Sequence, residues 1–130
     1  MTARTKKRIL VVEDNPANQM LTRTVLEGAG YEVDVATTSD DALHILQSQV
    51  PALILMDVEL PGRDGLSLTR LLKSMSPTTA IPVVAMTAHA TLQQRQEAIA
   101  AGCVGFIAKP IDVHTFASRI AEFLNASKEE

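Results

Sequence analysis

The sequence predicts a single α/β domain in which helices cover both faces of a doubly wound parallel sheet of five strands. Three observations support this prediction. Strand-like and helix-like segments alternate along the 130 residues, the connections between them are short, and the central strand-like segments are continuous apolar runs. A strand that is buried on both faces needs helices above and below it, and right-handed helical crossovers between parallel strands provide them.

The first strand and helix are predicted from an apolar run and from helix-capping residues. The strand lies in RILVVED at 8–14, where the apolar run ends in two acids. Asn15 can cap the following helix, with Pro16 at its first position. Gly28 and Gly30 end this helix, because glycine readily adopts the conformation that a helix end requires.

The second unit has a different strand pattern. In YEVDVAT at 31–37, apolar and polar residues alternate, which is typical of a strand with one solvent-facing side or of an edge strand. Ser39 is the expected cap of the next helix. The first turn of that helix carries Asp40 and Asp41, where the helix dipole favours acids, and Pro51 ends the segment.

The third strand carries a charge where a buried run ends. In LILMDVELPGRDG at 53–65, four apolar residues lead directly into Asp57 before the chain turns at Pro61 and Gly62. A carboxylate is costly inside a strand that is buried on both faces. Asp57 must therefore lie at the exit of the strand, or its charge must be compensated there.

The third and fourth helices enclose another buried strand. The third helix starts at Asp64 or Gly65 and turns its leucines to one side, namely Leu68, Leu71 and Leu72. IPVVAMT at 81–87 is a continuous apolar strand. A mostly polar helix follows from about Thr91 to Ala101 and stops at Gly102.

The last unit begins with CVGFIAK at 103–109, which predicts the fifth strand. Asp112 is the expected cap of the final helix. Helical spacing turns one set of apolar residues toward the core, namely Val113, Phe116, Ile120 and Phe123 or Leu124.

The strand patterns also predict the order of the sheet. The continuous apolar runs belong in the middle and the alternating strand at 31–37 belongs at an edge, which favours the order 2-1-3-4-5 of a flavodoxin-like (βα)5 fold. Ligands of such sheets bind at the carboxyl ends of the strands, near the switch point between strands 1 and 3. The residues at the strand ends are therefore the candidates for function.

Composition and charge exclude several other classes of protein. The formal net charge is −3, and the basic residues cluster only at the amino end (Arg4, Lys6, Lys7 and Arg8), so direct binding to nucleic acid is not expected. A single cysteine, Cys103, excludes an internal disulfide framework and fits a reducing compartment. No apolar stretch approaches the length needed to cross a membrane, so we expect a cytoplasmic protein without membrane contact.

Five side chains should converge at the carboxyl edge of the sheet. Glu13 and Asp14 follow strand 1, Asp57 ends strand 3, Thr87 ends strand 4 and Lys109 ends strand 5. Three carboxylates packed together would raise one another's pKa unless a cation joins them, and Mg²⁺ prefers carboxylates with room for water. With the metal bound, a carboxylate at position 57 can attack a phosphoryl group, while the lysine and the hydroxyl offset the oxygen charge.

Four motifs extend this argument to a family. In their order and over nearly the whole chain, VVEDN, LILMD followed by VELPGRDG, VVAMTA and FIAKP resemble the receiver domain of two-component response regulators, of the single-domain kind that regulates chemotaxis. The resemblance implies one receiver domain over 1–130, with a core at about 8–125. It also implies that Asp57 accepts phosphate from a phosphohistidine on a histidine kinase or a histidine phosphotransfer protein.

The resemblance also implies the roles of the other site residues. Asp14, Asp57 and the backbone carbonyl of Glu59 would bind Mg²⁺, or Mn²⁺ in its place, and Glu13 would act through water. Thr87 and Lys109 would bind the phosphoryl oxygens.

A switch is implied as well. Thr87 would move toward the phosphate and Phe106 would turn inward, which changes the partner preference of the face made by helix 4, strand 5 and helix 5. Phe106 replaces the tyrosine that is frequent at this position in the family, so its outward signal would be apolar.

The resemblance extends to three further features near the site. Lys109 and Pro110 match a cis peptide of the family. Glu59 and His89 are expected to tune the access of water, and hence dephosphorylation.

These inferences leave alternatives open. The protein is expected to be a signalling switch that catalyses its own phosphorylation and dephosphorylation, and to act freestanding on a downstream protein. A receiver domain excised from a hybrid histidine kinase would look similar. The chain could also be an enzyme of the aspartyl phosphatase kind, which usually carries a second acid two residues after the first. Glu59 stands at that position, but the hydroxyl signature that follows the second acid in such enzymes is missing. A flavin-binding module would need a hydroxyl-rich or glycine-rich loop where EDNPAN stands.

Overall fold

The computed structural model describes residues 7–60, 65–76, 78–89 and 91–128. The predicted turn at Pro61 and Gly62, a helix start at Asp64 and the basic residues Arg4 and Lys6 lie outside these ranges. The elements in chain order are β1 (Arg8–Val12), α1 (Pro16–Gly28), β2 (Glu32–Ala36), α2 (Ser39–Ser48), β3 (Leu53–Asp57), α3 (Gly65–Lys73), the 3-10 helix η1 (Thr78–Ala80), β4 (Val83–Thr87), α4 (Leu92–Ala101), β5 (Gly105–Ala108) and α5 (Phe116–Lys128).

Within the described residues, the strands form a five-stranded sheet in the order β2-β1-β3-β4-β5, and every neighbouring pair is parallel. This confirms the predicted fold class and strand order. Every residue of β3 and β4 is buried, whereas β2 shows the mixed burial of an edge strand. The continuous apolar runs thus occupy the middle of the sheet because only there do helices cover both faces.

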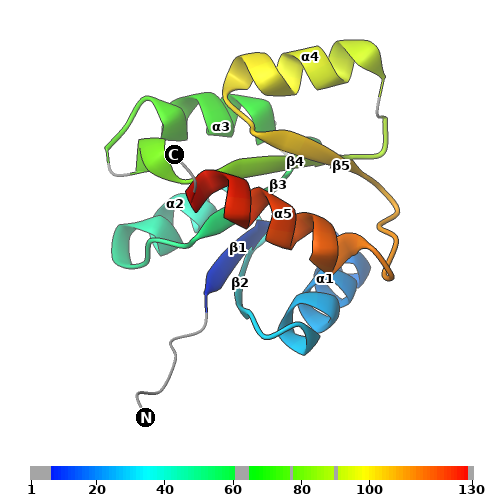
Figure 1. Cartoon of the computed structure of the whole chain (residues 1–130). Coiled ribbons are helices and arrows are strands. Elements are labelled where there is room, and N and C mark those ends of the chain that lie inside the picture. The colour runs from blue at the N-terminus through cyan, green and yellow to red at the C-terminus, as the bar shows by residue number, and fades with distance from the viewer. Residues whose placement is uncertain (1–6, 61–64, 77, 90, 129–130) are drawn as a thin grey trace.

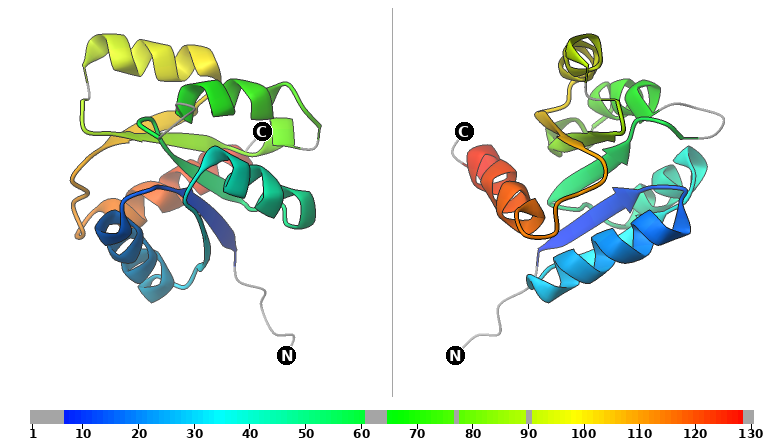
Figure 2. Two further views of the ribbon diagram at one scale, coloured as in Figure 1. Left: turned by 180° about the vertical axis from the view of Figure 1, so that it is seen from behind. Right: turned by 90° about the vertical axis from the view of Figure 1, so that its right-hand side faces the viewer.

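The alternation of side chains along the strands divides the core into two layers. Ile9 and Val11 face the layer that α1 and α5 complete, whereas Leu10 and Val12 face the layer that α2, α3 and α4 complete. Figures 1 and 2 show α5 on one side of the sheet and α3 and α4 on the other. A strand residue near the carboxyl edge can therefore be assigned to one layer by its position in the alternation.

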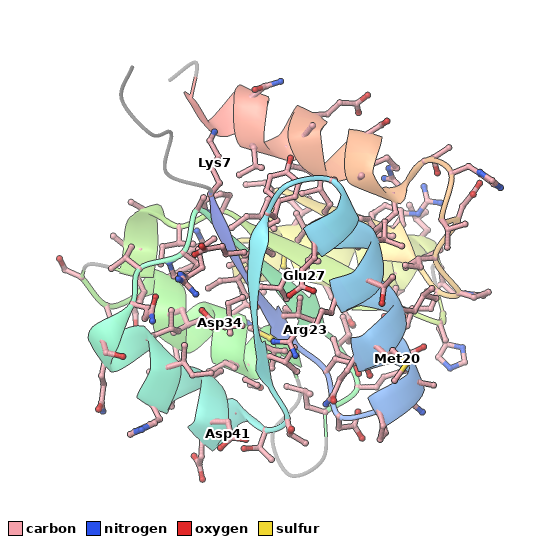
Figure 3. All side chains as sticks on the ribbon, turned by 90° about the horizontal axis from the view of Figure 1, so that it is seen from below. Lys7, Met20, Arg23, Glu27, Asp34 and Asp41 are labelled. Atoms are coloured by element: carbon pink, nitrogen blue, oxygen red, sulfur yellow. The ribbon has the colours of Figure 1, made fainter. Side chains whose placement is uncertain are left out.

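The exposed edge of the sheet is lined with charge. Arg8 of β1 donates to Asp34 at 2.9 Å and to Glu32 at 2.6 Å, and both acceptors belong to β2. Figure 3 shows Asp34 on one side of β2 and the α1 residues Arg23 and Glu27 on the other, so charged side chains flank this strand on both sides. Charged side chains at an edge strand disfavour pairing with a strand of another chain.

Two predicted helix starts are wrong, one by a single residue and the other by three. The cap of α2 is Thr38, whose side chain accepts from the Asp41 amide at 3.1 Å, and Ser39 is the first helical residue. Asp112 caps a turn by accepting from the His114 amide at 2.9 Å, and α5 begins only at Phe116. In both places neighbouring residues can cap equally well, so the backbone conformation decides.

Two predicted core residues are also less buried than expected. Val113 is 45% exposed because it lies in the turn before α5, whereas the core positions of that helix are Phe116, Ile120 and Leu124. Leu71 is only half-buried at the margin of the α3 stripe. Thr69 is fully buried there instead and donates its hydroxyl to the Gly65 carbonyl at 2.8 Å. Among the described residues no helix has the length and apolar character needed to span a membrane.

Candidate functional site

Asp57 is the last residue of β3 and is only 1% exposed. It continues the alternation of Leu53 and Leu55, which face the α1 and α5 layer. Its Oδ1 atom accepts from the Glu59 amide at 3.0 Å and lies 3.2 Å from Lys109 Nζ. The buried charge that the sequence placed at the strand exit is thus compensated by a hydrogen bond and by a cation.

Lys109 joins two of the acids. Its Nζ atom lies 3.2 Å from Asp57 Oδ1 and 3.2 Å from Glu13 Oε1, although Glu13 and Lys109 are 96 positions apart in the chain. Burial by itself would lower the pKa of the Lys109 ammonium, but the carboxylates of Asp57 and Glu13 outweigh it and raise that pKa. Lys109 is therefore charged at neutral pH.

Glu13 is as deeply buried as Asp57. It is 1% exposed, and its backbone amide donates to the Ala36 carbonyl at 2.9 Å, which extends the ladder between β1 and β2. Burial raises the pKa of the Glu13 carboxyl, and the nearby charge of Asp57 adds to this effect. The Asn15 amide at 3.2 Å and Lys109 act in the opposite direction. A further cation would stabilise the carboxylate form.

The acids form a group with the composition of a metal site. One carboxylate oxygen each from Glu13, Asp14 and Asp57 lies within 4.8 Å of the other two. Asp14 is half-buried while the other two are buried, so the group opens toward solvent on one side. Oxygen ligands with room for water suit Mg²⁺, which usually keeps several of its own water molecules. The residues present therefore fit a divalent cation.

The first residue of α3, Gly65, lies close to the backbone of Asp57. The Gly65 amide donates to the Val58 carbonyl at 2.9 Å. A Cβ atom at Gly65 would clash with the backbone carbonyl of Asp57 and with the Met56 side chain. The sequence predicted Gly65 only as a helix start and did not reveal this packing role. The available signal was a glycine at the first helical position, where propensity alone disfavours it.

Thr87 lies on the other side of the site. It is 3% exposed and ends β4. Its Oγ1 atom accepts from the His89 amide at 2.9 Å and donates to Gln94 Oε1 of α4 at 3.0 Å. In this arrangement the hydroxyl is bound to α4, not to Asp57. Gln94 was not predicted from the sequence, because a glutamine in a polar helix gives no signal of such a contact.

The remaining predicted residues surround the site. Phe106 of β5 is half-buried against the α2, α3 and α4 layer, and the Arg95 guanidinium lies 4.5 Å from its ring centroid. His89 Nε2 lies 3.3 Å from Glu59 Oε2, and both side chains are solvent-accessible. The peptide between Lys109 and Pro110 is cis, and the Lys109 amide donates to the Thr87 carbonyl at 2.8 Å.

Comparisons with known proteins agree on one family. The family profile described as the response regulator receiver domain matches residues 9–121. Among curated proteins, the polar-differentiation response regulator DivK from Brucella ovis is 37% identical over 118 residues, which cover 91% of this chain and 96% of that protein.

Solved structures give the same result. A CheY-like response regulator receiver domain protein from Methanospirillum hungatei is 29% identical with a TM-score of 0.87, covering 96% of this chain and 98% of its own. The receiver domain of a sensor histidine kinase from Pseudomonas aeruginosa, solved with a magnesium ion coordinated in the active site cleft, is 30% identical with a TM-score of 0.84. That match covers 93% of this chain and 99% of the other.

Proposed function

Because this chain belongs to the response regulator receiver domain family, we propose that Asp57 accepts a phosphoryl group from a phosphohistidine. The donor would be a histidine kinase or a histidine phosphotransfer protein. The observation that carries this proposal is the state of Asp57, a buried carboxylate at a strand end, held by the Glu59 amide and 3.2 Å from the Lys109 ammonium. A fixed carboxylate beside a cation is placed to act as a nucleophile toward phosphorus.

The metal in this proposal is Mg²⁺, with Mn²⁺ as a substitute. Asp14, Asp57 and the Glu59 carbonyl would hold it, and Glu13 would contribute through water. The mutual proximity of the three carboxylates supports this assignment. When bound, the ion would neutralise charge that develops on the phosphoryl oxygens.

The chain's own residues then supply position and charge. Lys109 brings an ammonium to the side of Asp57 where a phosphoryl oxygen would lie. Thr87 would donate its hydroxyl to another oxygen after modification, and Phe106 would turn inward. The face made by α4, β5 and α5 would then bind a downstream protein differently, through a shift between two populations.

The lifetime of the phosphate is the role proposed for Glu59 and His89. Their side chains are paired at 3.3 Å and remain open to solvent. The backbone amide of His89 also donates to Thr87 Oγ1, so a change in this pair would alter the surroundings of the Thr87 hydroxyl. We expect Glu59→Ala and His89→Ala to change the rate of autodephosphorylation. An unchanged rate in both variants would overturn this role.

We also propose that the protein acts as a freestanding regulator. The match to the Brucella DivK protein covers 96% of that response regulator, which supports this proposal. The alternative is a receiver of a hybrid kinase, as in the Pseudomonas relative. An immunoblot of the source cells distinguishes them, because the freestanding form runs near 14.0 kDa and a hybrid kinase runs much higher.

Incubation with acetyl phosphate and Mg²⁺ tests the central proposal. We expect intact-protein mass spectrometry to show the gain of one phosphoryl group in wild type and in Asp40→Asn, a control at an exposed acid on α2. The gain should be lost in Asp57→Asn. An equal gain in Asp57→Asn, or none in wild type, would overturn the proposal.

A further inference from the structure

Two consecutive residues of α4 hold the two residues that are expected to switch. Thr87 donates its hydroxyl to Gln94 at 3.0 Å, and the Arg95 guanidinium lies 4.5 Å from the Phe106 ring centroid. Gln94 is half-buried and Arg95 is exposed. One turn of a single helix thus contacts the last residue of β4 and the second residue of β5.

The register of the sheet explains why α4 can reach both residues. Phe106 is the partner of Ala85 in the pairing of β4 with β5, and both belong to the layer that α4 covers. Thr87 lies two positions after Ala85, so its side chain points to the same face. Ala98 of α4 is buried in this layer and anchors the helix over it.

The hydrogen bonds of Thr87 create a competition. A threonine hydroxyl has one proton to donate. That proton is directed to Gln94 Oε1, while a lone pair of the same oxygen accepts from the His89 amide. The hydroxyl cannot donate to a phosphoryl oxygen on Asp57 until its bond to Gln94 breaks.

We propose that Gln94 is a positioning residue that holds Thr87 in the resting arrangement, and that Arg95 restrains Phe106 from the same helical turn. This inference rests on the proposed function, because it assumes that Thr87 binds the phosphoryl group. Breaking the Gln94 bond frees the turn that carries Arg95, so release of Thr87 and release of Phe106 are coupled. The exposed surface of α4 around Arg95 changes when Thr87 and Phe106 are released.

Removal of the competing bond should favour the modified state. Beryllofluoride mimics a phosphoryl group on a carboxylate, and its affinity in the presence of Mg²⁺ can be followed by nuclear magnetic resonance. Gln94→Leu keeps the size of the side chain and removes the acceptor. The loss of one competing hydrogen bond should tighten beryllofluoride binding by about fivefold. Gln94→Glu retains an acceptor and should bind no more tightly than wild type.

Matched controls separate this effect from a general change in α4. Gln93→Leu alters the neighbouring residue, whose side-chain amide donates to Glu97 at 3.1 Å on the exposed side of the helix. This variant should leave the affinity for beryllofluoride unchanged. In a Thr87→Val background the hydroxyl is gone, so Gln94→Leu should have no further effect. The Phe106 ring signals of unbound Gln94→Leu should also move toward their positions in the bound wild type.

The outcomes distinguish the two levels of the proposal. If wild type fails to bind beryllofluoride, the proposed function itself fails. If wild type binds but Gln94→Leu and Gln93→Leu are equal, the receiver function stands and the role of Gln94 is overturned. A fivefold gain that persists in the Thr87→Val background would also overturn it, because the effect would not pass through the hydroxyl.

Discussion

At the scale of single residues, Lys109 balances the charge of the site. Its ammonium lies between the buried carboxylates of Glu13 and Asp57, and those carboxylates raise its pKa against the effect of burial. Removal of one partner of a buried pair leaves an uncompensated charge, which is more costly than the pair itself was favourable. The site therefore depends on Lys109 before any phosphate arrives.

We predict that Lys109→Ala is destabilised in buffer without divalent cations. The expected loss is about 3 kcal/mol in the free energy of unfolding, because two buried carboxylates lose their cation. Urea unfolding measures it, with Arg70→Ala on the exposed side of α3 as the control. A loss no larger than that of the control would mean that Lys109 does not compensate these acids.

Cys103 gives a second prediction at this scale. The thiol is buried, and burial raises its pKa from 9.0 to about 11. At pH 8 the thiolate fraction is then about a hundredfold lower than for a thiol with the unshifted pKa. Alkylation of Cys103 by iodoacetamide should therefore be at least about a hundredfold slower in the native protein than in urea, where the thiol is exposed. Equal rates in both conditions would contradict a buried thiol.

At the scale of elements, the first residue of α3 packs against the end of β3. Gly65 packs so closely that a Cβ atom would meet the Asp57 carbonyl. Gly28 in α1 is a matched control, because nothing lies within 4 Å of the place where its Cβ would be.

We predict opposite effects of alanine at these two glycines. Gly65→Ala should destabilise the protein by about 1–3 kcal/mol, because the backbone of β3 must shift. Gly28→Ala should be neutral or stabilising by up to about 1 kcal/mol, since alanine favours a helix. Thermal unfolding of both variants provides the measurement. Equal destabilisation of the two would show that the close approach at Gly65 is not what matters.

The elements also show where prediction from the sequence succeeds. β1, β3 and β4 were predictable because a short, continuous apolar run between turn residues is typical of a strand buried on both faces. The start of α2 was not, since Thr37, Thr38 and Ser39 can each cap a helix and only the backbone selects Thr38. The convergence of Glu13, Asp57 and Lys109 followed from parallel strands. The bond from Thr87 to Gln94 depends on side-chain packing, which no local pattern encodes.

At the scale of the whole molecule, the fold carries distant parts of the chain to one edge. The contact between Glu13 and Lys109 joins the residues that directly follow the first and last strands, 96 positions apart in the chain. A metal that needs side chains from distant parts of the chain binds the folded protein and not the unfolded chain. Its binding therefore raises the free energy of unfolding.

We predict that Mg²⁺ stabilises the protein. At an Mg²⁺ concentration of about a hundred times the dissociation constant, the gain should be about 2.7 kcal/mol. Urea unfolding with and without Mg²⁺ should show the gain in wild type and in Asp40→Asn, but not in Asp14→Asn. An equal gain in Asp14→Asn would remove that residue from the proposed ligands.

The most direct test of the phosphoacceptor role is the position of the phosphate itself. Borohydride reduces an acyl phosphate to an alcohol, so a phosphorylated aspartate becomes homoserine and can be located by peptide mass spectrometry. After incubation with acetyl phosphate and Mg²⁺, we expect homoserine at position 57 alone. Reduction at Asp14 or Glu13, or none at position 57 in a protein that has gained a phosphoryl group, would contradict the proposed role of Asp57.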